Sequence, residues 1–353
     1  MTHRERALAA FRFDPTDRPP CDLLENMLWE RLRAYFEEIH SLTDREEILD
    51  FIGADFRWVK VENPFYMRSL LGNTVKAGAL REESIPLSIG TLSDALFDRP
   101  LRDATLEDIE AIRFPSVDDI IFPDFKAARE RWPDHAIVFM PYNYGLFMSA
   151  CDSFGFEEAL IKMASEPEIF DALIRRMHEF NMEALRVGLE KARGYVDIIW
   201  TWDDFATQES LIMNPALWRE RIKPYIAEEI GCMRDYGFYT LYHSCGAIRS
   251  VLPDLIEIGV NGVEVFQVSA KGMDAAGIAR DFGGKMTFYG GIDVQTVLLS
   301  ADERETREAV RHNAACFKSC GGYIVANSHH GVDGIRTENI IAMCDEAHKI
   351  RYR

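Results

Sequence analysis

Short β-rich apolar runs alternate with longer helical stretches from about Ala136 to the end of the chain. This alternation is typical of βα units arranged around a parallel sheet. Six runs are predicted to be strands, at residues 136–140, 196–202, 239–242, 262–266, 285–289 and 322–326. The chain is therefore predicted to be an α/β protein with a parallel sheet.

Helix starts are predicted between these runs, where a capping residue precedes an amphipathic stretch. A capping side chain accepts hydrogen bonds from the free N–H groups of the first turn, and proline is favoured at the first helical position. The three predicted starts are Ser165 with Glu168, Asn214 followed by Pro215, and Ser300 with Glu303.

Two further strands are predicted in the N-terminal part, at residues 20–24 and 56–61. Eight strands would make a single-domain (β/α)8 TIM barrel over residues 1–353, with an N-terminal helical or irregular elaboration. Residues 62–135 are predicted to be an insertion or lid, because they carry Pro64, Pro86, Pro100, Pro115 and Pro123. A doubly wound open sheet stays the alternative fold. No Gly-x-Gly-x-x-Gly follows a predicted strand, so a dinucleotide site is unsupported.

The charge of the chain limits its partners. The sequence has 40 Lys and Arg residues against 58 Asp and Glu residues, a formal net charge of −18. This sign disfavours nucleic acid and anionic membrane surfaces as partners. The start, Met1 to Arg6, lacks the apolar core of a secretory signal, and the seven scattered cysteines suit reduced thiols. The protein is predicted to be cytoplasmic and to act on a small molecule.

The segment Tyr242–Gly246 places His243 and Cys245 two residues apart at the end of a predicted strand. Side chains alternate along a strand, so both point to the same side and can chelate one ion. Imidazole and thiolate suit zinc, and a catalytic zinc usually has three protein ligands. His329, at the end of the last predicted strand, is the predicted third ligand, and His330 is the competing choice. A hydrogen-bonded histidine beside a buried thiol is the alternative interpretation.

The other cysteines are predicted to be structural. Cys316 and Cys320 lie four residues apart on a helix that leads into the last predicted strand, below the level of the mouth. Free cysteine is among the residue types most often buried. The same interpretation applies to Cys21, Cys151, Cys232 and Cys344.

Further polar residues follow the predicted strands, where the βα loops of a parallel barrel form the active site. Asp203, Asp204, Gln267 and Asp293 are predicted to orient the substrate or relay a proton. The two aspartates could instead bind a substrate cation or cap a helix, and ordinary loop polarity is the alternative for Gln267, Asp293 and Gln295.

Glycine and aromatic residues complete the predicted site. Gly290 and Gly291 are predicted cofactor-binding residues, because a glycine pair at a strand end permits close approach of a ligand or a sharp turn. Aromatic side chains near these strand ends pack in the core or form the wall of a pocket for a flat or quaternary ammonium ligand. They are Tyr142, Tyr144, Trp200, Trp202, Phe205 and Phe266.

Together these segments resemble the uroporphyrinogen decarboxylase superfamily over about residues 136–348. The segments are Trp202–Asp204, His243–Arg249, Gln267–Asp274, Gly290–Gln295, His329 and Glu338–Ile340. Within the superfamily, the His-x-Cys-Gly segment is similar to the cobalamin-dependent methyltransferase branch. Members of that branch bind zinc with a His-x-Cys pair and a further ligand near the last strand.

The resemblance implies a zinc-dependent methyltransferase that moves a methyl group between a small substrate and a corrinoid carried by a partner protein. True uroporphyrinogen decarboxylases grip their substrate's carboxylates with an N-terminal arginine-rich segment. Residues 17–23 of this chain read Asp-Arg-Pro-Pro-Cys-Asp-Leu instead. Porphyrinogen decarboxylation is therefore the second candidate activity, and a non-catalytic small-ligand binding protein is the third possibility.

His329 stands where thiol-methylating members of the branch place a second cysteine. One thiolate and two neutral imidazoles would leave a zinc site with a net charge near +1, a stronger Lewis acid than a site with two thiolates. This charge favours a methyl ether, or another O- or N-methyl compound, as the methyl donor, and activation of a thiol acceptor is the alternative.

Overall fold

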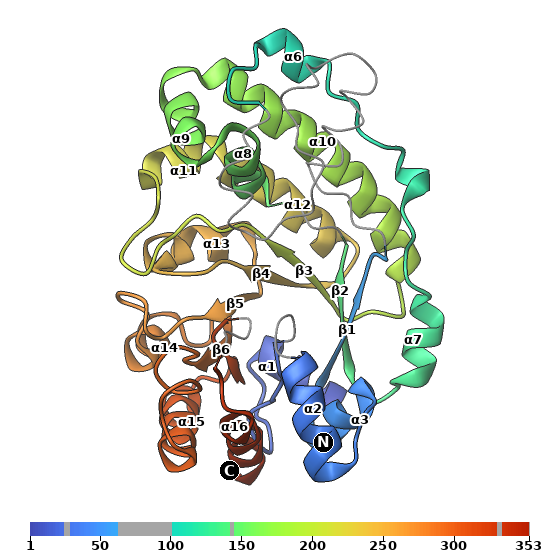
Figure 1. The fold of residues 1–353 in the computed structure, drawn as a ribbon, viewed down its shortest axis with the longest axis vertical. Coiled ribbons are helices and arrows are strands. Elements are labelled where there is room, and N and C mark those ends of the chain that lie inside the picture. Colours follow the sequence, from blue (N-terminus) through green and yellow to red (C-terminus); the bar gives the residue numbers. More distant parts are fainter. Residues whose placement is uncertain (25–28, 63–100, 142–144, 330–333, 353) are drawn as a thin grey trace.

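A computed structural model describes residues 1–24, 29–62, 101–141, 145–329 and 334–352. At its centre the described residues form one seven-stranded parallel sheet, whose strands follow one another in sequence order (Figure 1). The strands are β1 (Phe56–Lys60), β2 (Ala136–Met140), β3 (Ile198–Trp202), β4 (Tyr239–His243), β5 (Gly262–Phe266), β6 (Thr287–Ile292) and β7 (Tyr323–Asn327). The predicted α/β class and its parallel sheet are confirmed, and the architecture is TIM-barrel-like.

An eighth strand is not shown among the described residues. The segment predicted to form it, residues 20–24, makes one isolated parallel bridge, between Cys21 and Val325 of β7. Backbone bonds nevertheless join it to both sheet edges: Val325 N donates to Pro20 O at 2.9 Å, and Asp55 N, just before β1, donates to Cys21 O at 2.8 Å. Pro19 and Pro20 have no N–H groups to extend a ladder, which explains the short pairing.

Helices surround the sheet, and most of them are the crossovers between consecutive strands (Figure 1). Those before β2 are α1 (His3–Arg12), α2 (Trp29–His40), α3 (Arg45–Phe51), α6 (Leu106–Glu110), η2 (Val117–Asp119) and α7 (Phe125–Arg131). Those between β2 and β4 are α8 (Leu146–Phe154), α9 (Phe156–Ser165), α10 (Pro167–Ala192), α11 (Pro215–Arg221) and α12 (Lys223–Asp235). The remainder are η3 (Ile248–Val251), α13 (Leu252–Ile258), α14 (Ala275–Phe282), α15 (Glu303–Phe317) and α16 (Thr337–Lys349).

One of the three predicted helix starts is confirmed. Asn214 caps α11 by accepting a hydrogen bond from Ala216 N at 2.8 Å, with Pro215 at the first position. The prediction of Ser300 as a cap was wrong by two residues, because Asp302 forms the capping box with Glu305. Ser165 is the last residue of α9 rather than a cap, and α10 begins at Pro167.

The two faces of the sheet bury different sets of side chains. The outward face packs against the helices and forms the larger apolar cluster. The inward face forms a second cluster that includes Phe56, Val138, Ile198, Leu241 and Ile324. Residues of α1, among them Ala7 and Phe11, pack into this inner cluster, so the N-terminal helix closes one end of the barrel-like interior.

Four residues of the inward face lie in register across neighbouring strands. Trp202 of β3 pairs with His243 of β4, which pairs with Glu264 of β5, which pairs with Tyr289 of β6. Residues in register on parallel strands point to the same face. The register therefore brings an imidazole and a carboxylate side by side inside the barrel.

Two sequence predictions concern the rest of the surface. The insertion at residues 62–135 is described from residue 101 onward, where it contains α6, η2 and α7. The segment 63–100, and with it most of the predicted lid, lies outside the described residues.

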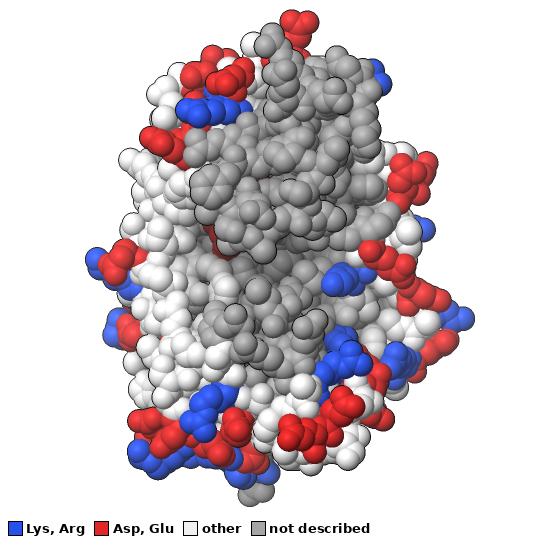
Figure 2. All heavy atoms as spheres, in the orientation of Figure 1, with Lys and Arg blue, Asp and Glu red and all other residues white. Residues whose placement is uncertain are grey.

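On the face shown in Figure 2, Lys and Arg side chains lie intermixed with Asp and Glu side chains. Among the described helices, none has the length and apolar character needed to cross a membrane.

Candidate metal centre

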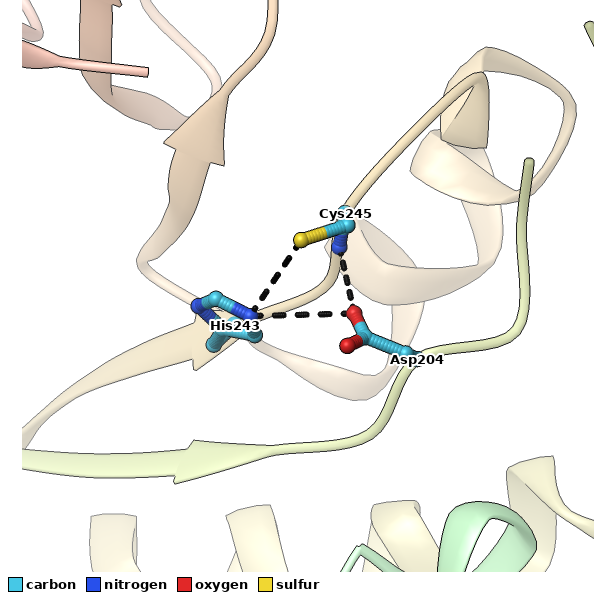
Figure 3. Close-up of side chains that lie close together, drawn as sticks. All are labelled: Asp204, His243 and Cys245. Atoms are coloured by element: carbon cyan, nitrogen blue, oxygen red, sulfur yellow. Dashed lines mark hydrogen bonds and ion pairs between the residues drawn. The ribbon is translucent and has the colours of Figure 1, made fainter. Parts of the chain in front are cut away.

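Three side chains that could hold a metal ion converge where β3 and β4 end: Asp204, His243 and Cys245 (Figure 3). His243 Nε2 lies 3.6 Å from Cys245 Sγ and 3.6 Å from Asp204 Oδ1. His243 is buried, whereas Asp204 and Cys245 are half-buried. The structure therefore places the predicted His-x-Cys pair together at a strand end, as its spacing required, and adds a carboxylate from the neighbouring strand end.

The donor spacing fits zinc. In a tetrahedral site with Zn–N and Zn–O bonds of about 2.0–2.2 Å and a Zn–S bond of about 2.3 Å, ligand atoms lie about 3.4–3.6 Å apart. The two separations from His243 Nε2 match that value. A nitrogen, a sulfur and an oxygen ligand are also the usual set for zinc. His243, Cys245 and Asp204 could thus hold one zinc ion and leave its fourth position open.

Glu264 fixes the orientation of the His243 ring. Its Oε2 lies 2.7 Å from His243 Nδ1, and the same oxygen accepts a hydrogen bond from Trp200 Nε1 at 2.7 Å. All three side chains are buried. A proton held on Nδ1 by this carboxylate leaves the Nε2 lone pair directed at the ion, the usual arrangement around a metal-bound histidine.

Sequence reasoning missed Glu264, although a signal was present. It is the single charged residue in the apolar run Gly262–Phe266, which was predicted to be a strand. Charged residues are almost never fully buried unless they are paired. The register of β4 with β5 then supplies the partner, His243.

The electrostatics of His243 follow from these neighbours. Burial alone would lower the pKa of its imidazole, but the Glu264 carboxylate and the Cys245 sulfur outweigh burial and hold that pKa well above its ordinary value. The neighbours thus create a field that favours a positive charge at this position. A bound cation would experience the same field.

The turn that carries Cys245 is held by backbone contacts. Cys245 N donates to Asp204 Oδ1 at 2.7 Å, which ties the two half-buried ligands together. Gly246 has φ of +87°, and a Cβ atom there would lie 2.4 Å from Thr207 O. Only glycine fits this position. Glycine after the cysteine therefore allows the loop following β3, which carries Asp204, to pack closely on the Cys245 turn.

Gln267, predicted to be catalytic, joins these loops. Its Oε1 accepts hydrogen bonds from Gly246 N at 2.6 Å and from Gln208 Nε2 at 2.8 Å. Gln208 belongs to the loop after β3, and Gln267 follows β5, so a single oxygen connects three strand ends. The side chain is buried, and the structure places it as a support of the Cys245 turn.

We predict that Gln267→Met lowers zinc affinity about 10- to 100-fold, the usual cost of losing a partner outside the ligand shell. The methionine fills similar space but accepts neither hydrogen bond, so the Cys245 turn loses its fixed distance to Asp204. Competition with a zinc-binding dye measures the change. Gln267→Glu is the matched control, because its oxygens can accept both bonds, and it should keep most of the affinity. Equal losses in both variants would contradict this role.

Asp203 is not a member of the group of Asp204, His243 and Cys245, and it caps a helix instead. Its carboxylate accepts hydrogen bonds from Phe147 N at 2.7 Å and Met148 N at 3.0 Å, in the first turn of α8. Burial raises the pKa of Asp203 to about 8, although the two N–H groups act in the opposite direction. Of the helix-capping and catalytic alternatives for the aspartate pair, the structure gives capping to Asp203 and brings Asp204 to the metal centre.

Asp293 and the glycine pair have local partners in the fold. Asp293 Oδ1 accepts from Thr296 N at 2.7 Å and Gln295 N at 3.1 Å, and its Oδ2 accepts from Ser269 Oγ at 2.6 Å. A Cβ at Gly290 would lie 2.8 Å from Phe266 N, and one at Gly291 would lie 2.7 Å from the Tyr323 hydroxyl oxygen. These glycines allow other protein atoms to approach closely, so packing within the fold explains why glycine occupies both positions.

His329 follows β7 but does not belong to the group formed by Asp204, His243 and Cys245. Its carbonyl accepts a hydrogen bond from Asn327 Nδ2 at 2.6 Å. Its part in binding a metal stays a prediction. The competing His330, and the aromatic residues Tyr142 and Tyr144, lie outside the described residues. The seven cysteines are all free, as predicted.

Fold and site together define a class: a TIM-barrel-like α/β protein with side chains that could hold a metal ion at the carboxyl ends of adjacent strands. A family model described as uroporphyrinogen decarboxylase (URO-D) matches residues 87–350. The chain belongs to this enzyme family, as its sequence segments predicted.

Two relatives illustrate the similarity. The chain is 21% identical over 287 residues to a uroporphyrinogen decarboxylase of Geotalea daltonii (strain DSM 22248 / JCM 15807 / FRC-32), covering 76% of each chain. A solved structure of a methyltransferase from Methanosarcina mazei superposes with a TM-score of 0.64 at 16% identity, covering 99% of each chain. At this identity the superposition shows a shared fold over the whole chain.

Proposed function

We propose that this protein is a zinc-dependent methyltransferase that moves a methyl group between a small substrate and a corrinoid carried by a separate protein. The observation that carries the proposal is the group of His243 Nε2, Cys245 Sγ and Asp204 Oδ1 at zinc-compatible spacing. The fold shared with a methyltransferase from Methanosarcina mazei supports it.

Each residue of the proposed centre has a distinct part. His243, Cys245 and Asp204 would hold the zinc ion, which supplies Lewis acidity at its open position when bound. Glu264 keeps the proton on His243 Nδ1, and Gln267 holds the turn that presents Cys245. Asp204 takes the place in this proposal that the sequence assigned to His329.

The exchange of ligand changes the charge of the centre. With one thiolate, one carboxylate and one neutral imidazole, a zinc site has a formal charge of zero rather than the +1 predicted with His329. A neutral site is the weaker Lewis acid. The sequence-based reason to favour a methyl ether donor, which depended on the higher charge, is therefore weakened.

Decarboxylation of a porphyrinogen is the second candidate, since the curated relative in Geotalea daltonii carries that name. One contact argues against it. Arg18, in the segment that replaces the family's arginine-rich motif, is buried and bound to Asp55, with N–O distances of 2.8 and 3.1 Å. An arginine engaged in this way is not available to a substrate carboxylate.

Methyl transfer tests the proposal directly. The zinc-loaded full chain is mixed with cob(I)alamin and a methyl donor, guaiacol or choline, and formation of methylcob(III)alamin is followed by absorbance. The reverse reaction starts from methylcob(III)alamin with a small thiol. Transfer in either direction that the Cys245→Ala variant loses is the expected result. Release of carbon dioxide from uroporphyrinogen, with no methyl transfer, would support the decarboxylase instead.

A further inference from the structure

Three tryptophans line the inward face of the sheet beside the metal centre. Trp58 lies on β1, and Trp200 and Trp202 lie on β3. The ring centroids of Trp58 and Trp200 are 6.5 Å apart in an edge-to-face arrangement, and Trp200 and Trp202 lie 5.6 and 6.5 Å from the His243 ring. Trp58 and Trp202 are half-buried. The metal centre therefore adjoins an aromatic wall.

Two of these indoles donate to buried carboxylates. Trp58 Nε1 donates to Asp22 Oδ2 at 2.8 Å, and Trp200 Nε1 donates to Glu264 Oε2 at 2.7 Å. Tyr289 donates its hydroxyl to the same Asp22 oxygen. The face of an indole ring is already the negative end of its quadrupole. A carboxylate on each indole N–H adds negative potential where few ions can screen it, and both features favour a cation over the rings.

Positive side chains are scarce on the described strands. The seven described strands contain two Lys or Arg residues in all, Arg57 and Lys60. Arg57 points to the outward side and binds Glu46 and Asp50 of α3. Lys60, at the end of β1, shares the inward side with Trp58 and is exposed. The charged side chains that accept hydrogen bonds from Trp58 and Trp200 are both buried carboxylates, Asp22 and Glu264.

The formal charge of the proposed zinc centre would not offset the negative charge of these carboxylates. A zinc ion held by Cys245, Asp204 and His243 adds no net charge. It would therefore not repel a cationic substrate bound beside it, whereas a site of charge +1 would.

We propose that the methyl substrate is an onium cation, a quaternary ammonium compound, held against Trp58 beside Trp200. This inference rests on the proposed function and names its substrate class. In the transfer, the C–N bond breaks and its electron pair stays on nitrogen, while the methyl carbon bonds to the cobalt of cob(I)alamin. The product is a neutral tertiary amine, so the leaving group needs no proton.

A pair of nearly isosteric ligands tests the charge preference on the unaltered protein. Choline and 3,3-dimethylbutan-1-ol have the same shape, but only choline is charged. Calorimetric titration of the zinc-loaded full chain should show choline binding at least about tenfold tighter, the effect of a desolvated cation–π contact. Tetramethylammonium should compete with choline. Equal affinities for choline and the alcohol, or no binding of either cation, would overturn the proposal.

Two variants locate the binding site. Trp58→Leu should abolish the preference for choline, and Trp132→Leu, at a half-buried tryptophan next to Arg131 outside the barrel-like interior, should keep it. Should Trp58→Leu fail to fold, Trp58→Phe preserves an aromatic face and should weaken the preference only in part. Choline preference without any methyl transfer to cob(I)alamin would contradict the proposed function while leaving the cation site established. The two failures are thus distinguishable.

Discussion

Replacing Cys245 with alanine is expected to remove zinc from the purified protein, whereas the wild type is expected to carry one zinc ion per chain. The thiolate is the one sulfur ligand of the group, 3.6 Å from His243 Nε2. Without it, an imidazole and a carboxylate are left to bind the ion, and zinc affinity should fall by more than about 100-fold, the upper end of losses for partners outside the ligand shell. Elemental analysis after dialysis against a weak chelator measures the zinc content.

Cys320→Ala is the matched control for this experiment. Cys320 undergoes the same change of side chain but lies between α15 and β7, before the amino end of β7, whereas the candidate centre lies where β3 and β4 end. Its variant should bind zinc as the wild type does. Wild-type protein without zinc, or a Cys245→Ala protein that retains it, would disprove the assignment of the centre.

The same measurement of zinc content decides whether Asp204 or His329 is the third ligand. If the group seen in the structure binds the ion, Asp204→Asn lowers zinc affinity and His329→Ala leaves it near the wild-type value. The opposite order would return His329 to the position predicted from the sequence. Asparagine keeps the oxygen that accepts the hydrogen bond from Cys245 N, so the variant tests charge with little change of geometry.

The strands were predictable because each βα unit has a local signature. The six runs from Ala136 onward, and the run at 56–61, are strands within three residues of their predicted ends. The segment at 20–24 differs, since its pairing depends on Pro19 and Pro20 and on contacts with β7 and Asp55, distant in sequence. Alternation of apolar residues alone could not show how far that ladder extends.

The metal centre was predictable in part for the same reason. His243 and Cys245 are two residues apart on one strand, so their proximity follows from the period of a strand. The third donor depends on how the loops after β3 and β7 fold across the mouth. Asp204 reaches the centre because Asp203 caps α8 and the Gly246 turn packs on Thr207. Such loop packing has no sequence period, and therefore Asp204 and His329 could not be distinguished in advance.

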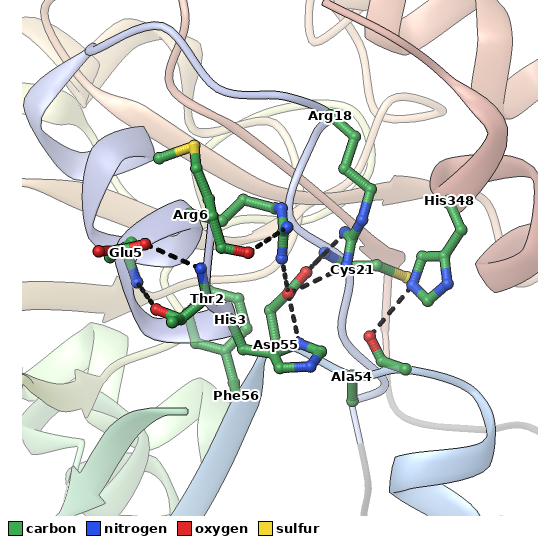
Figure 4. Close-up of polar contacts among 12 residues, drawn as sticks. Thr2, His3, Glu5, Arg6, Arg18, Cys21, Ala54, Asp55, Phe56 and His348 are labelled. Atoms are coloured by element: carbon green, nitrogen blue, oxygen red, sulfur yellow. Dashed lines mark hydrogen bonds and ion pairs between the residues drawn. The ribbon is translucent and has the colours of Figure 1, made fainter. Parts of the chain in front are cut away.

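The N-terminal region depends on a different buried charge, and Asp55→Asn is expected to destabilise the protein by about 3–5 kcal/mol, the usual cost of breaking a buried ion pair. The Asp55 side chain is fully buried and contacts Arg6 at 2.8 Å, Arg18 at 2.8 Å and His3 at 2.8 Å (Figure 4). Cys21 N also donates to it at 2.7 Å. Loss of the charge would leave two buried guanidinium groups without this carboxylate. Urea denaturation followed by circular dichroism measures the change.

The exposed pair of Arg12 and Asp14, 2.6 Å apart, provides the control, and Asp14→Asn should change stability by less than about 1 kcal/mol.

The stabilisation by Asp55 should also depend on pH. Burial raises the pKa of Asp55, but hydrogen bonds and charges from His3, Arg18 and Arg6 outweigh burial and lower that pKa below its ordinary value. Its contribution is therefore complete above the unfolded-state pKa of about 3.9 and is lost as the pH falls through the lower folded-state pKa. The difference in stability between wild type and Asp55→Asn should accordingly shrink in acid; a difference independent of pH would show that the charge of Asp55 is not what stabilises the region.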